Sequence, residues 1–136
     1  MSRNHFEDNL SVAVAAFLRR AEPGCMWWHS PNGGTRNKQE AARLKLMGVL
    51  KGVPDYIFIL PDCSIGFIEL KLEKTPHHAK SYQSKEQKVF HKDFEDLTDR
   101  KDRYAVCRSI NEVARALDGW GIIWMGRLID KPIKVV

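Results

Sequence analysis

Apolar residues at the start of the chain recur with the period of a helix. Because residues three and four apart share one side of a helix, this spacing predicts an amphipathic first helix. Asn4 is a suitable N-cap for it, and Pro23 and Gly24 end it. The apolar stripe consists of Phe6, Leu10, Ala13, Val14, Phe17, Leu18 and Ala21.

Short apolar segments then alternate with helical patterns. Residues 25–30 predict a strand, residues 31–34 a loop, and residues 37–47 a second helix that Gly48 closes. Residues 56–60 and 65–72 predict a hairpin with its turn at residues 61–64. Residues 75–83 predict a polar loop, residues 104–107 a strand, and residues 122–125 one more strand.

Two further helices are marked by serines that can cap them. Ser84 stands three residues before Gln87, and Ser109 three residues before Glu112, which is the spacing of a capping box. The apolar stripe expected after the first box consists of Val89, Phe90, Phe94 and Leu97.

The predicted order is helix, strand, helix, hairpin, helix, strand, helix. This alternation predicts an α/β fold in which helices flank a central mixed sheet. The 136 residues contain no repeat or linker, so we expect a single domain over residues 1–136.

Composition narrows the class of protein. Hydrophobic residues make up 43% of the chain and charged residues 29%, which is typical of globular proteins. No apolar run reaches the roughly 18 residues of a membrane span, and no leader peptide is recognisable, so we expect a soluble, cytoplasmic protein. Cys25, Cys63 and Cys107 lie far apart and are expected to be buried or half-buried reduced thiols.

Charge is unevenly distributed along the chain, whose formal net charge is +5. Residues 36–51 contain five basic side chains and one acidic one, whereas residues 93–102 contain five acidic and two basic ones. One part of the surface should therefore attract phosphate groups while another part repels them.

Two acidic residues and a lysine are predicted to meet at one end of the hairpin. Asp55 follows Pro54 at the entry to the first strand, while Glu69 and Lys71 share one face of the second strand. Mg²⁺ prefers oxygen ligands, so Asp55, Glu69 and the backbone carbonyl of Leu70 predict a metal site. Lys71 would orient water or neutralise charge on a phosphate. The alternative is a Glu69–Lys71 ion pair on a solvated strand face.

These motifs resemble the signature of the PD-(D/E)XK nuclease superfamily, and in particular its VRR-NUC (virus-type replication-repair) branch. The centre of the resemblance is Pro54-Asp55 followed by Glu69-Leu70-Lys71. The match extends over most of the chain through residues 29–34, 43–45, 48–49, 52–55 and 68–71, Ser84 with Gln87, and residues 108–112.

The resemblance implies a restriction-endonuclease-like αβββαβ core and Mg²⁺- or Mn²⁺-dependent hydrolysis of phosphodiester bonds in DNA. It implies that Glu7 completes the metal site and that Gln87 lies near it. Alternatively, Glu7 is simply an acidic residue that the N-terminus of the helix favours. For Gln87, the role of capping partner of Ser84 is compatible with a position near the active site. Small bacterial or phage chains of this branch resemble Holliday-junction resolvases, so branched DNA and a second copy in a homodimer are the expected partners. Neither a membrane nor a small-molecule cofactor is expected.

Basic and polar residues outside the acidic centre are candidates for contact with DNA. His29, Asn32 and Arg36 flank the glycine loop. They either contact the DNA backbone near the cleavage site or belong to an ordinary polar turn. His77, His78 and His91 lack the spacing of zinc ligands and are expected to be exposed loop residues. The full set of DNA-binding candidates is His29, Asn32, Arg36, Lys38, Arg43, Lys45, Lys51, Lys74 and Lys85.

Two other functions stay open at this point. One is a phage nicking or restriction-like endonuclease without selectivity for junctions, which would use the same residues. The other is a catalytically silent nucleic-acid-binding module. The presence of both acids and the lysine favours an enzyme, because carboxylates that face phosphate would only weaken binding.

Overall fold

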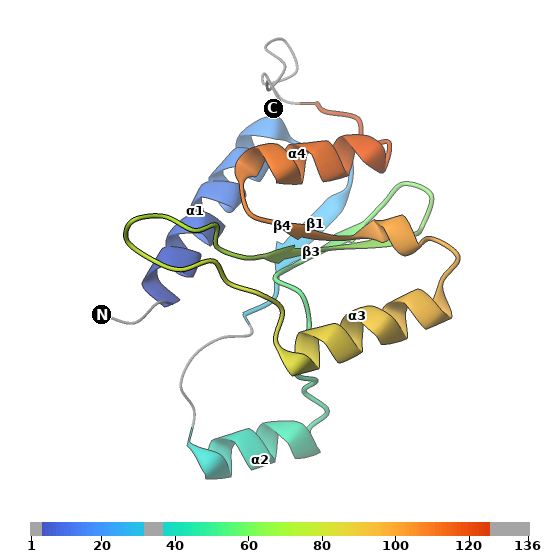
Figure 1. Ribbon diagram of the computed structural model, residues 1–136. Coiled ribbons are helices and arrows are strands. Elements are labelled where there is room, and N and C mark those ends of the chain that lie inside the picture. Colours follow the sequence, from blue (N-terminus) through green and yellow to red (C-terminus); the bar gives the residue numbers. More distant parts are fainter. Residues whose placement is uncertain (1–3, 32–36, 126–136) are drawn as a thin grey trace.

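Four strands form one open sheet at the centre of the fold. The computed structural model describes residues 4–31 and 37–125, with side chains from residue 6 onward. Strands β1 (Met26–His29), β2 (Tyr56–Ile59) and β3 (Ile65–Leu70) are antiparallel neighbours. Strand β4 (Tyr104–Cys107) lies parallel to β3 at the edge of the sheet. The result is the predicted mixed sheet (Figure 1).

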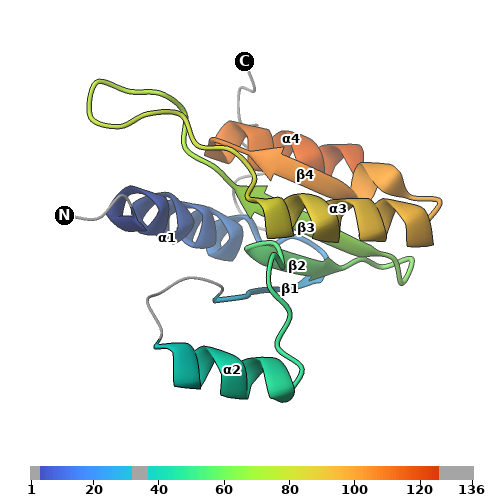
Figure 2. The same ribbon diagram turned by 60° about the horizontal axis from the view of Figure 1, so that its bottom comes forward.

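Helices cover both faces of the sheet. Helices α1 (Asn4–Ala21) and α4 (Ile110–Gly119) lie on one face, and α3 (Lys85–Leu97) lies on the other (Figures 1 and 2). Helix α2 (Lys38–Leu46) contains no buried residue and stands away from the sheet. A short 3₁₀ turn, η1 (Lys101–Arg103), leads into β4.

The apolar core lies between the sheet and the pair α1 and α4. Ile68 and Leu70 of β3 and Phe58 of β2 point into it because alternate strand residues share a face. Gly66 lies on this face, where an added Cβ would be 2.5 Å from the Trp120 ring. A glycine there allows the indole to pack directly on the strand.

The opposite face of the sheet meets α3 through a narrower apolar contact. Phe67 of β3 packs edge-on against Phe90 and Phe94, with ring centroids 5.2 and 5.0 Å away. The predicted stripe was half wrong, because Val89 and Leu97 are 54% and 88% exposed. The inward positions are instead spaced three and four residues apart, and Gln87, His91 and Glu95 are the half-buried polar members among them.

The hairpin and the first capping box are confirmed, and several finer predictions are corrected. Ser84 and Gln87 bond reciprocally, but Glu112 accepts the backbone N–H of Arg108 instead of that of Ser109. Residues 122–125 form no strand. One isolated bridge, between Pro23 and Trp124, joins that segment to the end of α1.

The cysteines differ in exposure. Cys107 is buried and Cys25 half-buried, as expected, and burial raises their pKa values to about 12 and about 11. Cys63 is exposed, against expectation, because it occupies the hairpin turn with a φ of 69°. Within the described ranges, no helix combines the length and apolarity that crossing a membrane requires.

Candidate active site

The register of the hairpin sets Asp55 beside Glu69, as predicted. Tyr56 pairs with Ile68, so one further step along the antiparallel ladder brings Asp55 opposite Glu69. The Leu70 N–H donates to Asp55 Oδ2 at 2.6 Å, and the Ser30 N–H donates to the Asp55 carbonyl at 2.8 Å. Asp55 is therefore held between the end of β1 and the end of β3. We call Asp55 and Glu69 the acid pair.

A glycine close to the Pro54-Asp55 segment lets the chain approach α3. Gly52 has a φ of +85°, and a Cβ added to it would lie 2.3 Å from the Glu86 carbonyl oxygen. Only a residue without a side chain fits this backbone-to-backbone contact. The contact fixes the path of the chain into β2 and hence the position of Asp55.

Glu69 is fully buried and only half satisfied. Tyr104 Oη donates to Glu69 Oε1 at 2.6 Å, and Gln83 Nε2 donates to the same oxygen at 3.3 Å. Glu69 Oε2 is buried and has no hydrogen-bond partner in the described structure. A buried carboxylate oxygen without a donor is costly, so this atom calls for a ligand that the described residues do not provide.

A small polar network supports Glu69 from β4 and α3. The His91 ring stacks on the Tyr104 ring with centroids 3.7 Å apart and planes 8° apart. His91 Nδ1 lies 3.3 Å from Gln83 Nε2, and His91 Nε2 lies 3.7 Å from Glu95 Oε2. Burial and the neighbouring Glu69 raise the pKa of Tyr104, so its hydroxyl stays protonated and donates.

Asp55 is a carboxyl group whose charge is disfavoured. Burial raises its pKa from 3.8 to about 6, against the lowering effect of the Leu70 N–H bond. The negative charge of Glu69 raises the pKa of Asp55 further, while His29 and Lys71 lower it. Two acids that share a dry site repel each other, and a cation between them would remove that repulsion.

Lys71 lies just beyond the end of β3 and is 7% exposed. Its N–H donates to the Cys107 carbonyl at 2.9 Å, which continues the pairing with β4. Glu69 is 0% exposed, and the ion pairs found in the described part of the chain do not include a Glu69–Lys71 pair. The alternative of a solvated surface ion pair is therefore wrong.

The donors present fit Mg²⁺ with few protein ligands. Among the described residues, no three His, Cys, Asp or Glu side chains form a group that could hold a metal. Glu7 is half-buried on α1 and is not gathered with the acid pair into such a group. Mg²⁺ commonly takes one or two carboxylates and completes its shell with water and substrate phosphate, so the acid pair is sufficient. The Leu70 carbonyl as a further ligand stays a prediction.

The sequence analysis missed three side chains of the site: Gln83, Tyr104 and His91. It expected Gln87 near the site, where Gln83 lies instead. The Gln87 side chain accepts the Ser84 N–H at 2.8 Å, whereas Gln83 contacts Glu69. Tyr104 and His91 were also missed, and His91 was wrongly expected in an exposed loop. The pairing of β3 with β4, 35 residues apart for Tyr104 and Glu69, decides these contacts, and local patterns do not reveal it.

The predicted DNA-binding residues fall into three places. His29 is exposed at the end of β1, close enough to Asp55 to lower its pKa. Lys74 is exposed within the loop that connects β3 to α3, and Lys85 is exposed at the first residue of α3. Asn32 and Arg36 lie outside the described residues. The remaining candidates are exposed on or just after α2, away from the sheet: Lys38, Arg43, Lys45 and Lys51.

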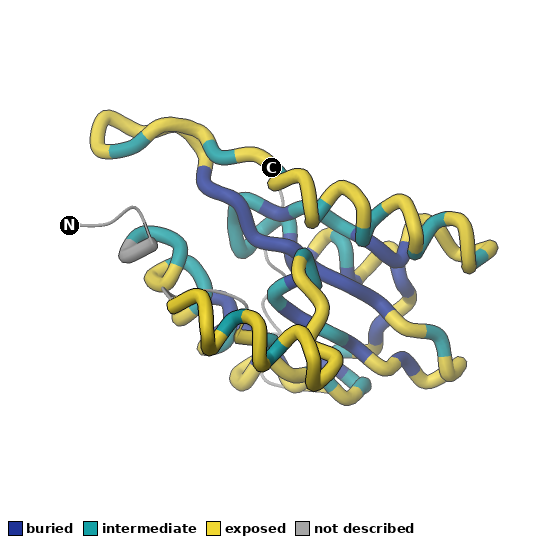
Figure 3. Tube along the Cα trace, turned by 90° about the horizontal axis from the view of Figure 1, so that it is seen from below, coloured by how far each residue is buried: buried dark blue, intermediate teal, exposed yellow. Residues whose placement is uncertain are grey.

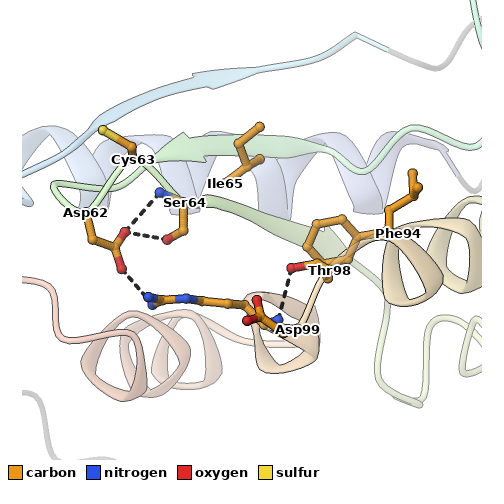
Figure 4. A pocket seen from close by; sticks show the side chains of 9 residues that line it. Asp62, Cys63, Ser64, Ile65, Phe94, Thr98 and Asp99 are labelled. Carbon is orange, nitrogen blue, oxygen red and sulfur yellow. Dashed lines mark hydrogen bonds and ion pairs between the residues drawn. The ribbon is translucent and has the colours of Figure 1, made fainter.

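A surface pocket of about 370 Å³ lies at the other end of the hairpin (Figure 4). Its apolar lining includes Ile65, Phe94 and Leu97, and its polar lining includes Asp62, whose carboxylate pairs with Arg100 at 2.6 Å. The acid pair does not line this pocket. The two ends of the hairpin therefore offer different chemistry.

Comparisons with known proteins return no family model, no curated protein and no solved structure that matches the chain.

Proposed function

We propose that the chain is a metal-dependent nuclease that hydrolyses phosphodiester bonds in DNA at the acid pair. The observation that carries the proposal is Glu69 Oε2, a buried carboxylate oxygen without a partner in the described structure, next to a second, half-buried acid, Asp55. A divalent cation would satisfy this oxygen and remove the repulsion between Asp55 and Glu69.

Each residue of the site has a distinct task in this proposal. Asp55 and Glu69 hold the ion, and Tyr104 with Gln83 fixes the Glu69 carboxylate so that Oε2 is the free oxygen. A bound Mg²⁺ supplies the Lewis acid that polarises the phosphate and lowers the pKa of water. Lys71, buried beside the acids, stabilises the negative charge that grows on the phosphoryl oxygens.

The arrangement of the chain supports the restriction-endonuclease-like core that the family resemblance implies. Without α2, the first elements run α1, β1, β2, β3, α3, β4, which is the αβββαβ order. The Pro54-Asp55 and Glu69-x-Lys71 motifs fall on neighbouring strands, with their acids opposite each other. Membership in the VRR-NUC branch rests on these motifs and is part of the proposal.

The decisive test compares Glu69→Gln with wild type in a cleavage assay on labelled DNA with Mg²⁺, Mn²⁺ or EDTA. We expect wild type to cut with either metal, and the variant to lose more than about 100-fold in rate, since removing even the residues behind a metal ligand costs 10–100-fold. Glu22→Gln is the matched control, because Glu22 is an exposed acid just beyond the end of α1. Undiminished cutting by Glu69→Gln would reject the site.

The substrate is proposed to be branched DNA, and the active form a homodimer. A symmetric four-way junction presents two strands related by a two-fold axis, which suits a dimer with two sites. Rates on a four-way junction, a flap and a linear duplex should differ, with the junction fastest, and sedimentation should give twice the chain mass. Equal rates on all three substrates would leave a nicking or restriction-like nuclease. DNA binding without any cleavage would favour the catalytically silent module.

A further inference from the structure

The loop between β3 and α3 carries an exposed aromatic residue on a fixed segment of backbone. Figure 3 shows the buried strand β3 leading into this loop, which is largely exposed. The returning half of the loop is anchored on both sides of Tyr82. The Ser81 N–H donates to the Leu72 carbonyl at 3.0 Å, Ser81 Oγ accepts the Leu72 N–H at 2.6 Å, and Gln83 donates to Glu69.

Tyr82 is 68% exposed in spite of these anchors. Its ring therefore projects from a defined position instead of from a loose loop tip. Since Gln83 reaches the carboxylate of Glu69, Tyr82 lies one residue, or about 3.8 Å between Cα atoms, from a residue that touches the acid pair. The ring therefore stands on the same chain segment as a side chain that contacts the proposed cleavage site.

Two cations lie over the Tyr82 ring. The Arg108 guanidinium lies 5.5 Å and the Lys80 ammonium 5.8 Å from the ring centroid, both within range of a cation–π contact. Arg108 is itself fixed, because its Nη1 donates to the Leu72 carbonyl at 2.6 Å. A guanidinium has five N–H donors, so others remain for a phosphate oxygen.

An exposed aromatic ring with two cations close to it fits one nucleotide unit, whose base stacks on the ring while its phosphate meets the cations. In an intact duplex, the internal bases are stacked on one another and their faces are not accessible. We propose that Tyr82, with Arg108 and Lys80, is a stacking platform for an unpaired base of DNA beside the acid pair. The inference rests on the proposed nuclease function and assigns its substrate class: DNA with an unpaired nucleotide next to the cut.

The test measures binding in EDTA, so that its outcome is independent of metal and cleavage. The probes are a DNA with a 2-aminopurine-labelled single-stranded flap and a fully paired duplex of the same length. We expect Tyr82→Ala to weaken flap binding by about 5-fold to 100-fold, the usual value of one aromatic–base stack, and to alter duplex binding by less than about 2-fold. Tyr82→Phe should retain flap binding, because stacking requires the ring and not the hydroxyl.

One variant serves as a control and a second extends the test. Trp28→Ala removes an aromatic residue that is 41% exposed on β1, outside the loop, and should leave flap binding unchanged. Lys80→Gln should weaken flap binding more than duplex binding, because the phosphate that Lys80 would meet belongs to the unpaired nucleotide. Unchanged circular dichroism will show that each variant is folded.

The outcomes separate the platform from the nuclease. Unchanged flap binding by Tyr82→Ala, or an equal loss on flap and duplex, would overturn the platform, and metal-dependent cleavage by wild type would leave the nuclease standing. Absence of DNA binding by wild type would also overturn the platform. Binding of a protein partner through Tyr82 would overturn it as well and would assign the ring to a protein interface. A flap-specific loss in a chain that never cleaves DNA would support the platform and reject the nuclease.

Discussion

Asp55 and Asp62 lie beyond the two ends of β2, and their surroundings shift their pKa values in opposite directions. Asp62 is exposed in the hairpin turn. It accepts from Ser64 N–H at 2.9 Å and from Ser64 Oγ at 2.5 Å, and it pairs with Arg100 at 2.6 Å. These donors lower the pKa of Asp62. At the other end of the strand, burial raises the pKa of Asp55 to about 6 in spite of its bond from Leu70.

The difference separates an acid whose charge is compensated in a turn from an acid whose charge is disfavoured by its surroundings. Asp62 receives donors from its own turn and a cation from the segment before β4, so its negative charge is compensated within the protein. Asp55 faces a second buried acid, Glu69, with one oxygen that nothing in the described structure satisfies. Such an arrangement destabilises the free protein and is typical of functional sites.

The largest expected effect comes from exchanging each aspartate for asparagine in turn. Asp55→Asn should lower Mg²⁺-dependent cleavage by more than about 100-fold, because it removes a direct ligand and not merely a supporting residue. Asp62→Asn, the same exchange in the same hairpin, should leave the rate within about 2-fold, since a surface substitution of this kind rarely disturbs the rest of the fold. Initial rates on one DNA substrate measure both. Equal losses in the two variants would remove the functional distinction between the two ends of the hairpin.

Tyr104→Phe tests whether the support of Glu69 sharpens that distinction. The variant keeps the ring that stacks on His91 and packs near Phe67, but it removes the 2.6 Å hydrogen bond to Glu69 Oε1. We expect Mn²⁺ affinity, measured by calorimetry, to fall by roughly 10-fold to 100-fold, as is usual for a partner of a metal ligand. Tyr82→Phe makes the same change on an exposed tyrosine and should not alter Mn²⁺ affinity. An unchanged dissociation constant in Tyr104→Phe would mean that Gln83 alone suffices to hold the carboxylate.

The stability of the metal-free protein should depend on pH through Asp55. A carboxyl group whose pKa is higher in the folded state contributes stability below its unfolded value, 3.8, and loses it as pH rises through about 6. In EDTA at pH 8, Asp55→Asn should therefore unfold with a free energy about 1–3 kcal/mol higher than wild type. Near pH 4 the two proteins should converge. Urea titrations at both pH values measure the difference in unfolding free energy. A wild type that is more stable than Asp55→Asn at pH 8 would contradict the raised pKa of Asp55.

The meeting of Asp55, Glu69 and Lys71 at one end of the hairpin was predicted from the sequence, because it depends on local patterns. Three local features were enough to predict that these side chains lie together. They are the alternation of Glu69 and Lys71, the position of Pro54 before Asp55, and the length of the hairpin. Strand period and turn chemistry act over a few residues, so they can be recognised without knowledge of the fold.

What the sequence did not reveal depends on contacts between distant elements. Tyr104 reaches Glu69 only because β4 pairs parallel to β3, and His91 turns inward only because α3 packs on Phe67. The expected inward role of Glu7 likewise required the placement of α1 on the sheet, and the fold does not gather Glu7 with the acid pair. Helical periodicity gives the apolar face of a helix but not the residue that this face will meet.

The smallest effect is expected at Asp62, and its sign is opposite to that at Asp55. A carboxyl group whose pKa is lowered contributes stability above its unfolded value, 3.8, and loses it as pH falls through the folded value. Asp62→Asn should thus lower the midpoint of thermal unfolding slightly at pH 7, and by less at acidic pH. Since Asp62 and Arg100 are both exposed, high salt should also reduce the difference between variant and wild type. Calorimetric scans at low and high salt measure this. A large, salt-independent loss at Asp62 would show that the turn carries more of the fold than its exposure implies.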